Sequence, residues 1–530
     1  MDIIDVLVFI GTHTIIILAT STLLPFSYRL QYHPLRRFPG PIAAKLSDAY
    51  NGYFSFRKRL HLTTLKDHST YGSVMRHGPN KLLFNSATAL HDIYDNDRLV
   101  KSYINSALLQ SSGVYSLFTV INKEPHRVKR KIVGSAINER VVRVFEPTME
   151  EQIDIFIKCL FVSSRDSAPV NITERVTYLA CDIVALLSLG FPLKLQTNPI
   201  YRFMVAGMFR ANHLANTRMQ WFRLHQLRIF SLLNYFANDI RERYKRLMET
   251  MIKSRLSEEK NVRQDLFSII SDASSRGENI RVSDIWTETI SFFPAGAFST
   301  SAGTCALFFY LAHNRECYDK LTDEIRNSFT NGTDICSGFQ LSSCHYLRAC
   351  IDEALRIAPP VPGTLWRELA SDEKHKPLVI DGHVVPPETQ VGVNIYSLHH
   401  NEEYFPDSFT FKPERWLPSE ATESQRELMR QAFTPFSIGY RGCAGKAMAY
   451  LETSLIIAKS LWYFDFKLVP GHLGSIGRGI PGRTDGRNRR DEYQLYDVIA
   501  GGHDGPYLAF TPRGDACNGM TVEGLTFRDD

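Results

Sequence analysis

Apolar positions recur at helical spacing along much of the chain. Tyr235 to Leu256 and Ser283 to Ala312 carry apolar side chains three and four residues apart, which predicts two long helices. A smaller strand-rich part is expected over Leu378 to Val393, where Ile380-Asp381-Gly382-His383 supplies the turn of a hairpin. Another short strand is expected over Tyr507 to Phe510. The pattern therefore predicts a mainly α protein with a smaller β-rich part.

A continuous apolar run opens the chain, from Val6 to Leu24. It holds no Asp, Glu, Lys or Arg, and at about 1.5 Å per residue a helix of that length nearly spans a bilayer core of about 30 Å. A cleaved signal peptide is the alternative. However, Asp2 and Asp5 stand where such a peptide carries Lys or Arg, and no clear small-x-small site follows. The run predicts a single N-terminal transmembrane helix, with the anchor at residues 1–28.

Three arginines follow the anchor, at positions 29, 36 and 37. The positive-inside rule then leaves the rest of the chain on the cytosolic face of the membrane. Residues 29–41 are basic and proline-rich and end in Phe38-Pro39-Gly40-Pro41, so we expect a stiff hinge between the anchor and the globular part.

Residues 42–530 are expected to form one large domain, because no repeat or low-complexity linker interrupts the chain up to residue 470. Residues 471–490 are rich in Gly and Arg, which predicts a mobile surface loop. The nine cysteines are scattered, which favours a reducing compartment over a disulfide framework. A formal charge of +5 is mild for 530 residues and gives no indication of nucleic-acid binding.

One decapeptide carries the strongest chemical signal. Residues 436–445 read Phe-x-x-Gly-x-Arg-x-Cys-x-Gly, which points to Cys443 as a haem ligand. A lone cysteine is more often a buried, inert thiol. Here four further fixed positions surround it, so we interpret Cys443 as the metal ligand.

The residue types around the thiol suit that role. Gly439 and Gly445 let a backbone without side chains lie close to a flat macrocycle. Arg441 has the planar fork that holds a propionate bidentately. Phe436 shields the sulfur from water, and a thiolate in a dry, amide-rich loop pushes electron density onto iron, which favours O–O cleavage. The chemistry indicated is oxygen activation.

The decapeptide resembles the cysteine-ligand loop of the haem-thiolate monooxygenases, the cytochromes P450. Two upstream elements extend the resemblance: Glu353-Ala354-Leu355-Arg356 matches the family's E-x-x-R, and Phe411 to Trp416 matches its P-E-R-F-like element. On a helix, Glu353 and Arg356 share one face. The resemblance implies the P450 fold, a haem b cofactor with an axial thiolate, and a structural triad in which Arg415 joins Glu353 and Arg356.

The segment Ala295 to Thr300 resembles the family's A-G-x-(acid)-T-T element over the haem. Gly296 is expected to leave room for dioxygen, and Ser299 takes the place of the catalytic threonine, with Thr300 beside it. Phe298 replaces the usual acid, which removes the ordinary proton donor. Three explanations for Phe298 remain open. Water, Thr300 or a substrate hydroxyl relays the protons, or the reaction is an oxidation that needs less control of proton delivery. In the third, Phe298 packs against a neighbouring helix.

Four cations are implied to face the haem propionates, since buried carboxylates need cationic partners: His126, Arg130, Arg367 and Arg441. Arg127, Lys129 and Lys131 would project from the proximal face, either as a solvated charged run or as a docking patch for an acidic reductase. Candidate pocket residues come from family position alone: Ser291, Phe292, Phe298, Val361 and Leu365.

The sequence thus predicts a monooxygenase that uses O2 and NADPH-derived electrons from a separate flavoprotein reductase to oxidise an apolar small molecule. Its Pro- and Arg-rich segments resemble those of fungal members that act on terpenoids, polyketides or alkaloids in secondary metabolism. The expected location is the endoplasmic reticulum membrane. The alternatives are a haem-thiolate isomerase or dehydratase that uses no external O2, and a catalytically silent haem-binding protein.

Overall fold

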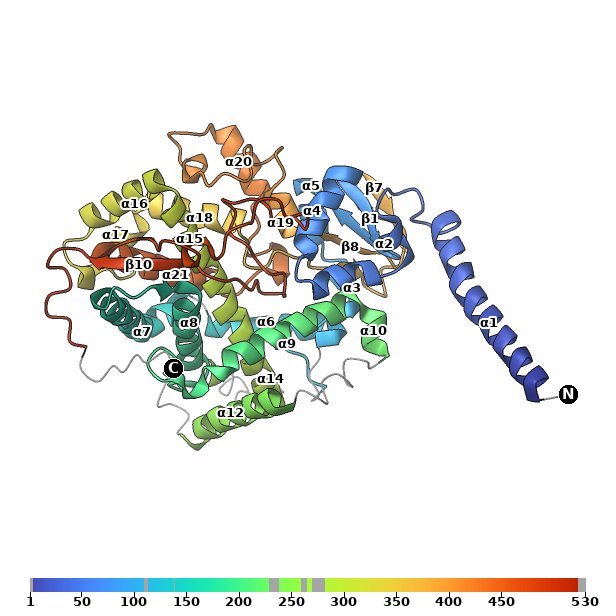
Figure 1. The fold of residues 1–530 in the computed structure, drawn as a ribbon, viewed down its shortest axis with the longest axis horizontal. Helices are drawn as coiled ribbons and strands as arrows, with labels where there is room; N and C mark the ends of the chain where they lie inside the picture. Colours follow the sequence, from blue (N-terminus) through green and yellow to red (C-terminus); the bar gives the residue numbers. More distant parts are fainter. Residues whose placement is uncertain are drawn as a thin grey trace.

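The computed structural model describes residues 3–108, 113–137, 139–227, 238–258, 265–268 and 282–522. This part of the chain is mostly helical, with β-sheets beside the helices, so the fold class expected from the apolar pattern is confirmed (Figure 1). The α-helices are α1 (Ile3–Gln31), α2 (Ile42–Leu46), α3 (Ala49–Phe56), α4 (Leu60–Tyr71), α5 (Ala87–Tyr94), α6 (Lys123–Ala136), α7 (Glu139–Arg165), α8 (Ile172–Leu189), α9 (Phe203–Gln220), α10 (Phe222–Gln226), α12 (Asn238–Ser257), α14 (Val282–Phe293), α15 (Ser299–His313), α16 (Arg315–Ser328), α17 (Phe339–Ser342), α18 (His345–Ile357), α19 (Ile395–His399), α20 (Glu423–Ala432) and α21 (Lys446–Tyr463). Short helices of other types are η1 (Tyr103–Leu108), η2 (Pro199–Tyr201), η3 (Pro294–Phe298), η4 (Gly332–Asp334), η5 (Pro413–Trp416), η6 (Gly439–Arg441) and η7 (Leu473–Ser475).

The strands form sheets of five, three and two strands within the described residues, in the orders β1-β2-β8-β5-β3, β4-β10-β9 and β6-β7. Their bounds are β1 (Val74–Gly78), β2 (Lys81–Phe84), β3 (Leu99–Lys101), β4 (Val170–Asn171), β5 (Arg367–Leu369), β6 (Leu378–Ile380), β7 (His383–Val385), β8 (Gln390–Val393), β9 (Phe464–Leu468) and β10 (Tyr507–Pro512). The pair β2 and β8 is parallel and the others are antiparallel.

Two local predictions are confirmed by these strands. The strands β6 and β7 form the expected hairpin, and its two turn residues, Asp381 and Gly382, have φ values of 47° and 71°. Positive φ at both central residues is the geometry that matches the twist of a two-residue hairpin. The strand expected from residue 507 is β10. The predicted helix at 235–256 corresponds to α12, and residues 235–237 lie outside the described residues.

One long helical stretch crosses the middle of the molecule, made of α14, η3 and α15. The segment η3 is a π-turn that begins at Pro294, which has no N–H to give to the carbonyl four residues earlier. The following helix is buried from Thr300 to Leu311 and packs against α8, α18 and α21. Trp286–His313 is long and apolar enough to cross a membrane, but 78% of its apolar window is buried inside the protein. It is therefore a core helix.

The N-terminal helix α1 extends away from the globular body (Figure 1). Its large apolar side chains are exposed: the exposed fraction is 72% for Ile4, 63% for Leu7 and 69% for Leu24. Apolar side chains on an unpacked helix are stable only in contact with another apolar phase or partner.

The segment expected to be a hinge, residues 29–41, is fastened to the sheet. Leu35 and Phe38 are buried, and the Arg76 backbone N–H donates to Pro39 O at 2.7 Å. Gly40 has a φ of 149°, and a Cβ there would lie 2.3 Å from Arg76 O, so only glycine fits this close approach. The segment therefore sets a fixed direction for α1.

The Gly- and Arg-rich segment 471–490 is also attached. Arg487 is 8% exposed, and its guanidinium donates to Lys58 O at 3.1 Å and to Leu495 O at 2.8 Å. These bonds join the segment to the chain just before α4. Arg487 thus fixes the position of a segment whose Gly- and Arg-rich composition alone predicts a mobile loop.

Candidate functional site

The decapeptide with Cys443 forms a compact loop between α20 and α21. The Cys443 backbone N–H donates to Phe436 O at 2.8 Å, and that of Gly442 donates to Gly439 O at 2.9 Å. Gly439 has a φ of 71°, and a Cβ at this position would lie 2.1 Å from Tyr94 O. The sequence needs glycine here both for the left-handed backbone and for the contact with α5.

The Cys443 thiol lies at the surface of the loop, beside charged groups. Its residue has exposed surface, yet burial raises the pKa of the thiol, which means that protein atoms surround it closely. The Gly445 backbone N–H, Arg130 and Lys446 act on the pKa in the opposite direction. A soft thiolate donor beside cations suits an iron ligand. The other eight cysteines are free, and Cys336 is the one exposed member.

The four basic residues expected near the haem propionates gather around the loop, His126 among them as a neutral imidazole. Burial lowers the pKa of His126 to about 3, with further lowering by Arg441, Lys101, Arg130 and Arg367. These charges come from β3, α6, β5 and η6, so the fold assembles them from four distant parts of the chain. We call His126, Arg130, Arg367, Arg441 and Lys101 the cation cluster.

Lys101 was not expected from the sequence. It belongs to β3, and burial lowers the pKa of its ammonium group well below the usual value, with Arg367 and Arg441 adding to the effect. A single lysine in a short strand carries no motif, so no sequence signal could have identified it. Only the pairing of β3 with β5, which places Lys101 opposite Arg367, brings it to the cluster.

The cation cluster has room for acidic partners. Arg130 donates to Gly442 O at 2.6 Å, Arg441 donates to Val120 O at 2.8 Å and Ile121 O at 2.5 Å, and Arg367 donates to Leu365 O at 3.2 Å. All of these recorded acceptors are neutral carbonyls, and within the described residues Arg441 Nε is buried without an acceptor. Buried cations of this kind fit a dianionic group such as the two haem propionates.

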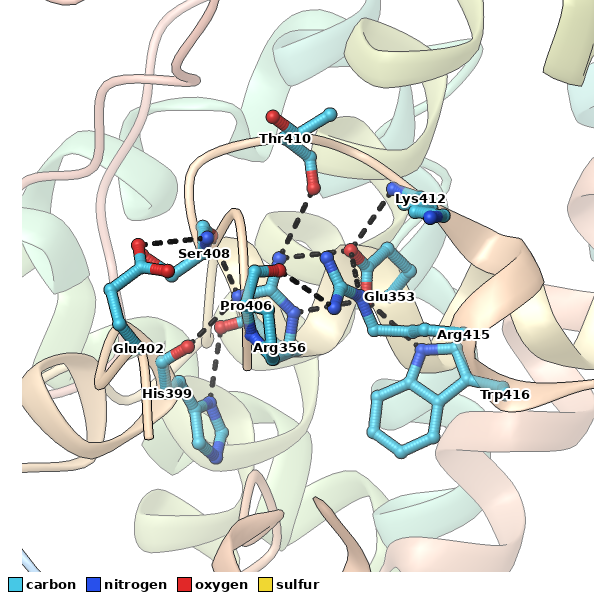
Figure 2. Close-up of polar contacts among 10 residues, drawn as sticks. All are labelled: Glu353, Arg356, His399, Glu402, Pro406, Ser408, Thr410, Lys412, Arg415 and Trp416. Atoms are coloured by element: carbon cyan, nitrogen blue, oxygen red, sulfur yellow. Dashed lines mark hydrogen bonds and ion pairs between the residues drawn. The ribbon is translucent and has the colours of Figure 1, made fainter. Parts of the chain in front are cut away.

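The triad predicted from the sequence is present in the structure (Figure 2). Glu353 is fully buried, and its carboxylate lies 2.8 Å from Arg356 Nη2 and 3.0 Å from Arg415 Nε. It also accepts bonds from the Lys412 backbone N–H and Trp416 Nε1, each at 3.0 Å. Two guanidinium groups and two further donors hold the pKa of the Glu353 carboxyl below its usual value despite burial.

His399 connects this triad to the cysteine loop. Its Nδ1–H donates to Arg356 O at 3.1 Å (Figure 2). Its Nε2 accepts from the Thr434 backbone N–H at 3.0 Å, two residues before Phe436. This pattern requires the neutral imidazole. Burial, with the charge of Arg356, lowers the pKa of His399 to about 3, which agrees with that requirement.

The central helix presents the predicted distal residues differently from expectation. A Cβ at Gly296 would lie 2.7 Å from Val184 Cγ2, so this glycine permits close packing against α8. Ala295 has exposed surface, and the partly exposed Ser299 donates its hydroxyl to Ala295 O one turn earlier. Thr300 is 7% exposed. The face with Ala295 and Ser299 is therefore the accessible one.

Phe298 points into the protein core. It is 6% exposed and belongs to the hydrophobic cluster formed by side chains of α8, α9 and α12, together with Phe293 and Ala297. This placement favours packing, and it speaks against Phe298 as a pocket-lining residue. The other pocket candidates are partly exposed: Ser291, Phe292, Val361 and Leu365.

Lys129 does not belong to an exposed docking patch. Its ammonium group lies 3.1 Å from Asp284 Oδ1 and 3.0 Å from Glu288 Oε1, both on α14. Arg127 and Lys131 are exposed on the other side of α6, and Arg127 pairs with Glu124. Arg127, Lys129 and Lys131 are two residues apart, and a helix directs positions two apart to different sides. Lys129 therefore faces inward although its two basic neighbours are exposed.

Comparison with known proteins agrees with this site. Residues 52–473 match the family model described as Cytochrome P450. The chain is 31% identical to the cytochrome P450 monooxygenase AKT7 of Alternaria alternata, covering 91% of this chain and 94% of the relative. It is 30% identical to the monooxygenases apf7 of Gibberella fujikuroi, covering 94% and 97%, and poxM of Penicillium oxalicum, covering 91% and 91%.

Replacement of Glu353 by Gln should destabilise the protein strongly. The change leaves Arg356 and Arg415 buried without their shared counter-charge, and breaking a buried pair costs about 3–5 kcal/mol. Urea unfolding followed by tryptophan fluorescence measures the loss. Glu423→Gln on α20, where the carboxylate is exposed and pairs with Arg426 and Arg430, is the control and should leave the midpoint unchanged. Equal midpoints for the two variants would contradict the role of the triad.

His399 should make stability depend on pH. Its folded pKa of about 3 lies below the usual value of about 6.5, so its stabilisation is complete above pH 6.5 and is lost as the pH falls. Between the two pKa values, this stabilisation decreases by about 1.4 kcal/mol for each unit by which the pH falls. His399→Gln cannot titrate, so the difference in unfolding free energy between wild type and variant should shrink from pH 7 to pH 5.5. A constant difference would show that His399 is not held neutral.

Proposed function

The chain belongs to the cytochrome P450 family and is a haem-thiolate monooxygenase, and we propose that Cys443 is the axial ligand of its haem iron. The observation that carries this proposal is the accessible thiol of Cys443, held in its loop beside the cation cluster. The haem, when bound, supplies an iron centre that activates O2. The bond from Cys443 N–H to Phe436 O holds the backbone of the loop that would present the thiol to iron.

The cation cluster holds the propionates in this proposal. Arg130, Arg367 and Arg441 supply guanidinium donors, His126 a ring N–H, and Lys101 an ammonium group. A buried dianion requires compensation of this size. Two observations support this proposal. The recorded acceptors of Arg130 and Arg441 are neutral carbonyls, and the buried Arg441 Nε has no acceptor among the residues that the structure describes.

Ser299 and Thr300 are the proposed hydroxyl groups for proton handling on the distal side. Ser299 holds its proton toward Ala295 O and can turn it toward the accessible face of the helix. Phe298 lies in the core and takes no part in this scheme. Protons then pass through Ser299, Thr300, water or a hydroxyl of the substrate.

The proposed substrate is an apolar small molecule of fungal secondary metabolism, a terpenoid, polyketide or alkaloid. Support comes from relatives in Alternaria, Gibberella and Penicillium, each a cytochrome P450 monooxygenase. The partly exposed Phe292, Val361 and Leu365 would line an apolar site. An isomerase or dehydratase is less favoured, because Phe298, its only support, packs in the core. A catalytically silent haem protein is less favoured, because Cys443, Gly296 and Ser299 are all present.

The proposed electron donor is an NADPH-dependent flavoprotein reductase. Arg127 and Lys131 are exposed on α6, the helix that also carries His126 and Arg130 of the cation cluster. An exposed basic pair so close to the proposed haem suits the approach of an acidic partner, since complementary charges mainly raise the association rate. Lys129 is excluded from this role by its pairs with α14.

The proposed location is the endoplasmic reticulum membrane, with residues 1–28 as a single-pass anchor, residues 29–41 as the connection and residues 42–530, including the segment 471–490, as the catalytic domain on the cytosolic face. Support comes from the exposed apolar side chains of α1 and from the arginines that follow the apolar run.

Cys443→Ala should abolish thiolate ligation. The reduced wild-type protein with carbon monoxide should show the red-shifted Soret band typical of a thiolate ligand. The variant should lack that band, and Cys336→Ala, which changes the exposed cysteine, is the control that should keep it. Retention of the band in Cys443→Ala would overturn the assignment.

Deletion of residues 2–28 should release the protein from membranes and leave haem binding intact. The apolar helix α1 provides the attachment, and the globular body begins after it. Carbonate extraction followed by ultracentrifugation measures the distribution, and the carbon monoxide spectrum measures haem binding. A truncated protein that still remains in the membrane pellet after carbonate treatment would show that a single anchor is not the means of attachment.

A further inference from the structure

The described part of the loop before α6, residues 113–122, is held at its backbone by three charged side chains from separate elements. We call it the α6 loop. Glu288 of α14 accepts from the Leu117 backbone N–H, Lys101 of β3 donates to Phe118 O, and Arg441 donates to the carbonyls of residues 120 and 121. The loop therefore touches both the central helix and the cation cluster.

The contact with Glu288 is the one that joins the loop to the central helix. Glu288 is 4% exposed, and its Oε1 and Oε2 lie 2.9 and 3.0 Å from Leu117 N. The Lys129 ammonium group lies 3.0 Å from Oε1 and supplies the counter-charge. A buried carboxylate is stable only with such partners, so the loop, α6 and α14 are fixed to one another at this point.

The same carboxylate belongs to the central helix, the stretch that also carries Ala295 and Ser299. Glu288 precedes Ala295, which has exposed surface, by about two helical turns. Its charge also acts on the ammonium group of Lys101 in the cation cluster. The loop is therefore attached both to the central helix and to the cation cluster.

We propose that Glu288 is a positioning residue that holds the α6 loop over the haem site and so limits the access of bulky ligands to the iron. The proposal rests on the proposed haem site. Within the loop, Ser116 and Thr119 bond to each other, with the Ser116 backbone N–H 2.8 Å from Thr119 Oγ1, so the loop also has bonds of its own that do not depend on Glu288. Loss of the Glu288 attachment frees the unit at the central helix and leaves the attachments to Lys101 and Arg441.

The experiment compares a small and a bulky iron ligand on the full-length, haem-loaded protein. Carbon monoxide is the small probe and 4-phenylimidazole the bulky probe, each followed by stopped-flow absorbance. Glu288→Ala removes the attachment, and Glu288→Gln keeps an acceptor of nearly the same shape without the charge. The matched control is Glu146→Gln on α7, because Glu146 is also a buried carboxylate that accepts a backbone N–H, that of Ser337.

Both Glu288 variants should keep the thiolate-type carbon monoxide spectrum and the wild-type rate of carbon monoxide binding. The association and dissociation rates of 4-phenylimidazole should rise by about ten-fold in Glu288→Ala, the size expected for a lost bond to a charged group, and by less in Glu288→Gln. Glu146→Gln should match wild type with both probes. A general loss of stability would change both probes together.

Wild-type rates for 4-phenylimidazole in Glu288→Ala would overturn the proposal. If Glu288→Ala does not retain haem, Glu288→Gln decides: an increase confined to the bulky probe supports the positioning role, and unchanged rates refute it. Failure of the haem site itself would appear separately, as a wild-type protein without the thiolate-type spectrum.

Discussion

The fully buried carboxylate of Glu353 is the interaction on which the proximal half of the molecule depends. It compensates the charges of Arg356 and Arg415, and Arg356 in turn bonds to the carbonyls of His399 and Ser408. Because a buried charge without a partner is very costly, the chain segments that supply these groups must stay together. His399 then carries the constraint to the backbone at Thr434, where the approach to the cysteine loop begins.

A second constraint arises from the cations beside that loop. Lys101 and Arg441 donate to carbonyls of the α6 loop while they belong to the cluster proposed to hold the propionates. The same side chains therefore have two tasks, one in positioning a loop and one in binding a cofactor. Arg441 of the cysteine loop bonds to the α6 loop, and the α6 loop bonds to Glu288 of the central helix. The cysteine loop and the central helix are thus connected through the α6 loop.

The central helix shows how tight packing changes the meaning of a motif. Gly296 lies against Val184 of α8, and Phe298 fills the cluster between α8, α9 and α12. Both residues thus serve the contact between helices, and the accessible face is left to Ala295 and Ser299. The π-turn from Pro294 to Phe298 lies at this contact. Turns of this type often occur at functional sites.

The sequence alone determined the helical class, the β6–β7 hairpin and the triad of Glu353, Arg356 and Arg415, because period, turn chemistry and motif are local properties. It also indicated His126, Arg130, Arg367 and Arg441 for the cation cluster. Only the tertiary structure decided that Lys101 joins them, that Lys129 faces inward and that Gly296 and Phe298 serve packing. The physical reason is that strand pairing and helix rotation, which select the neighbours of a side chain, depend on residues far away in the chain.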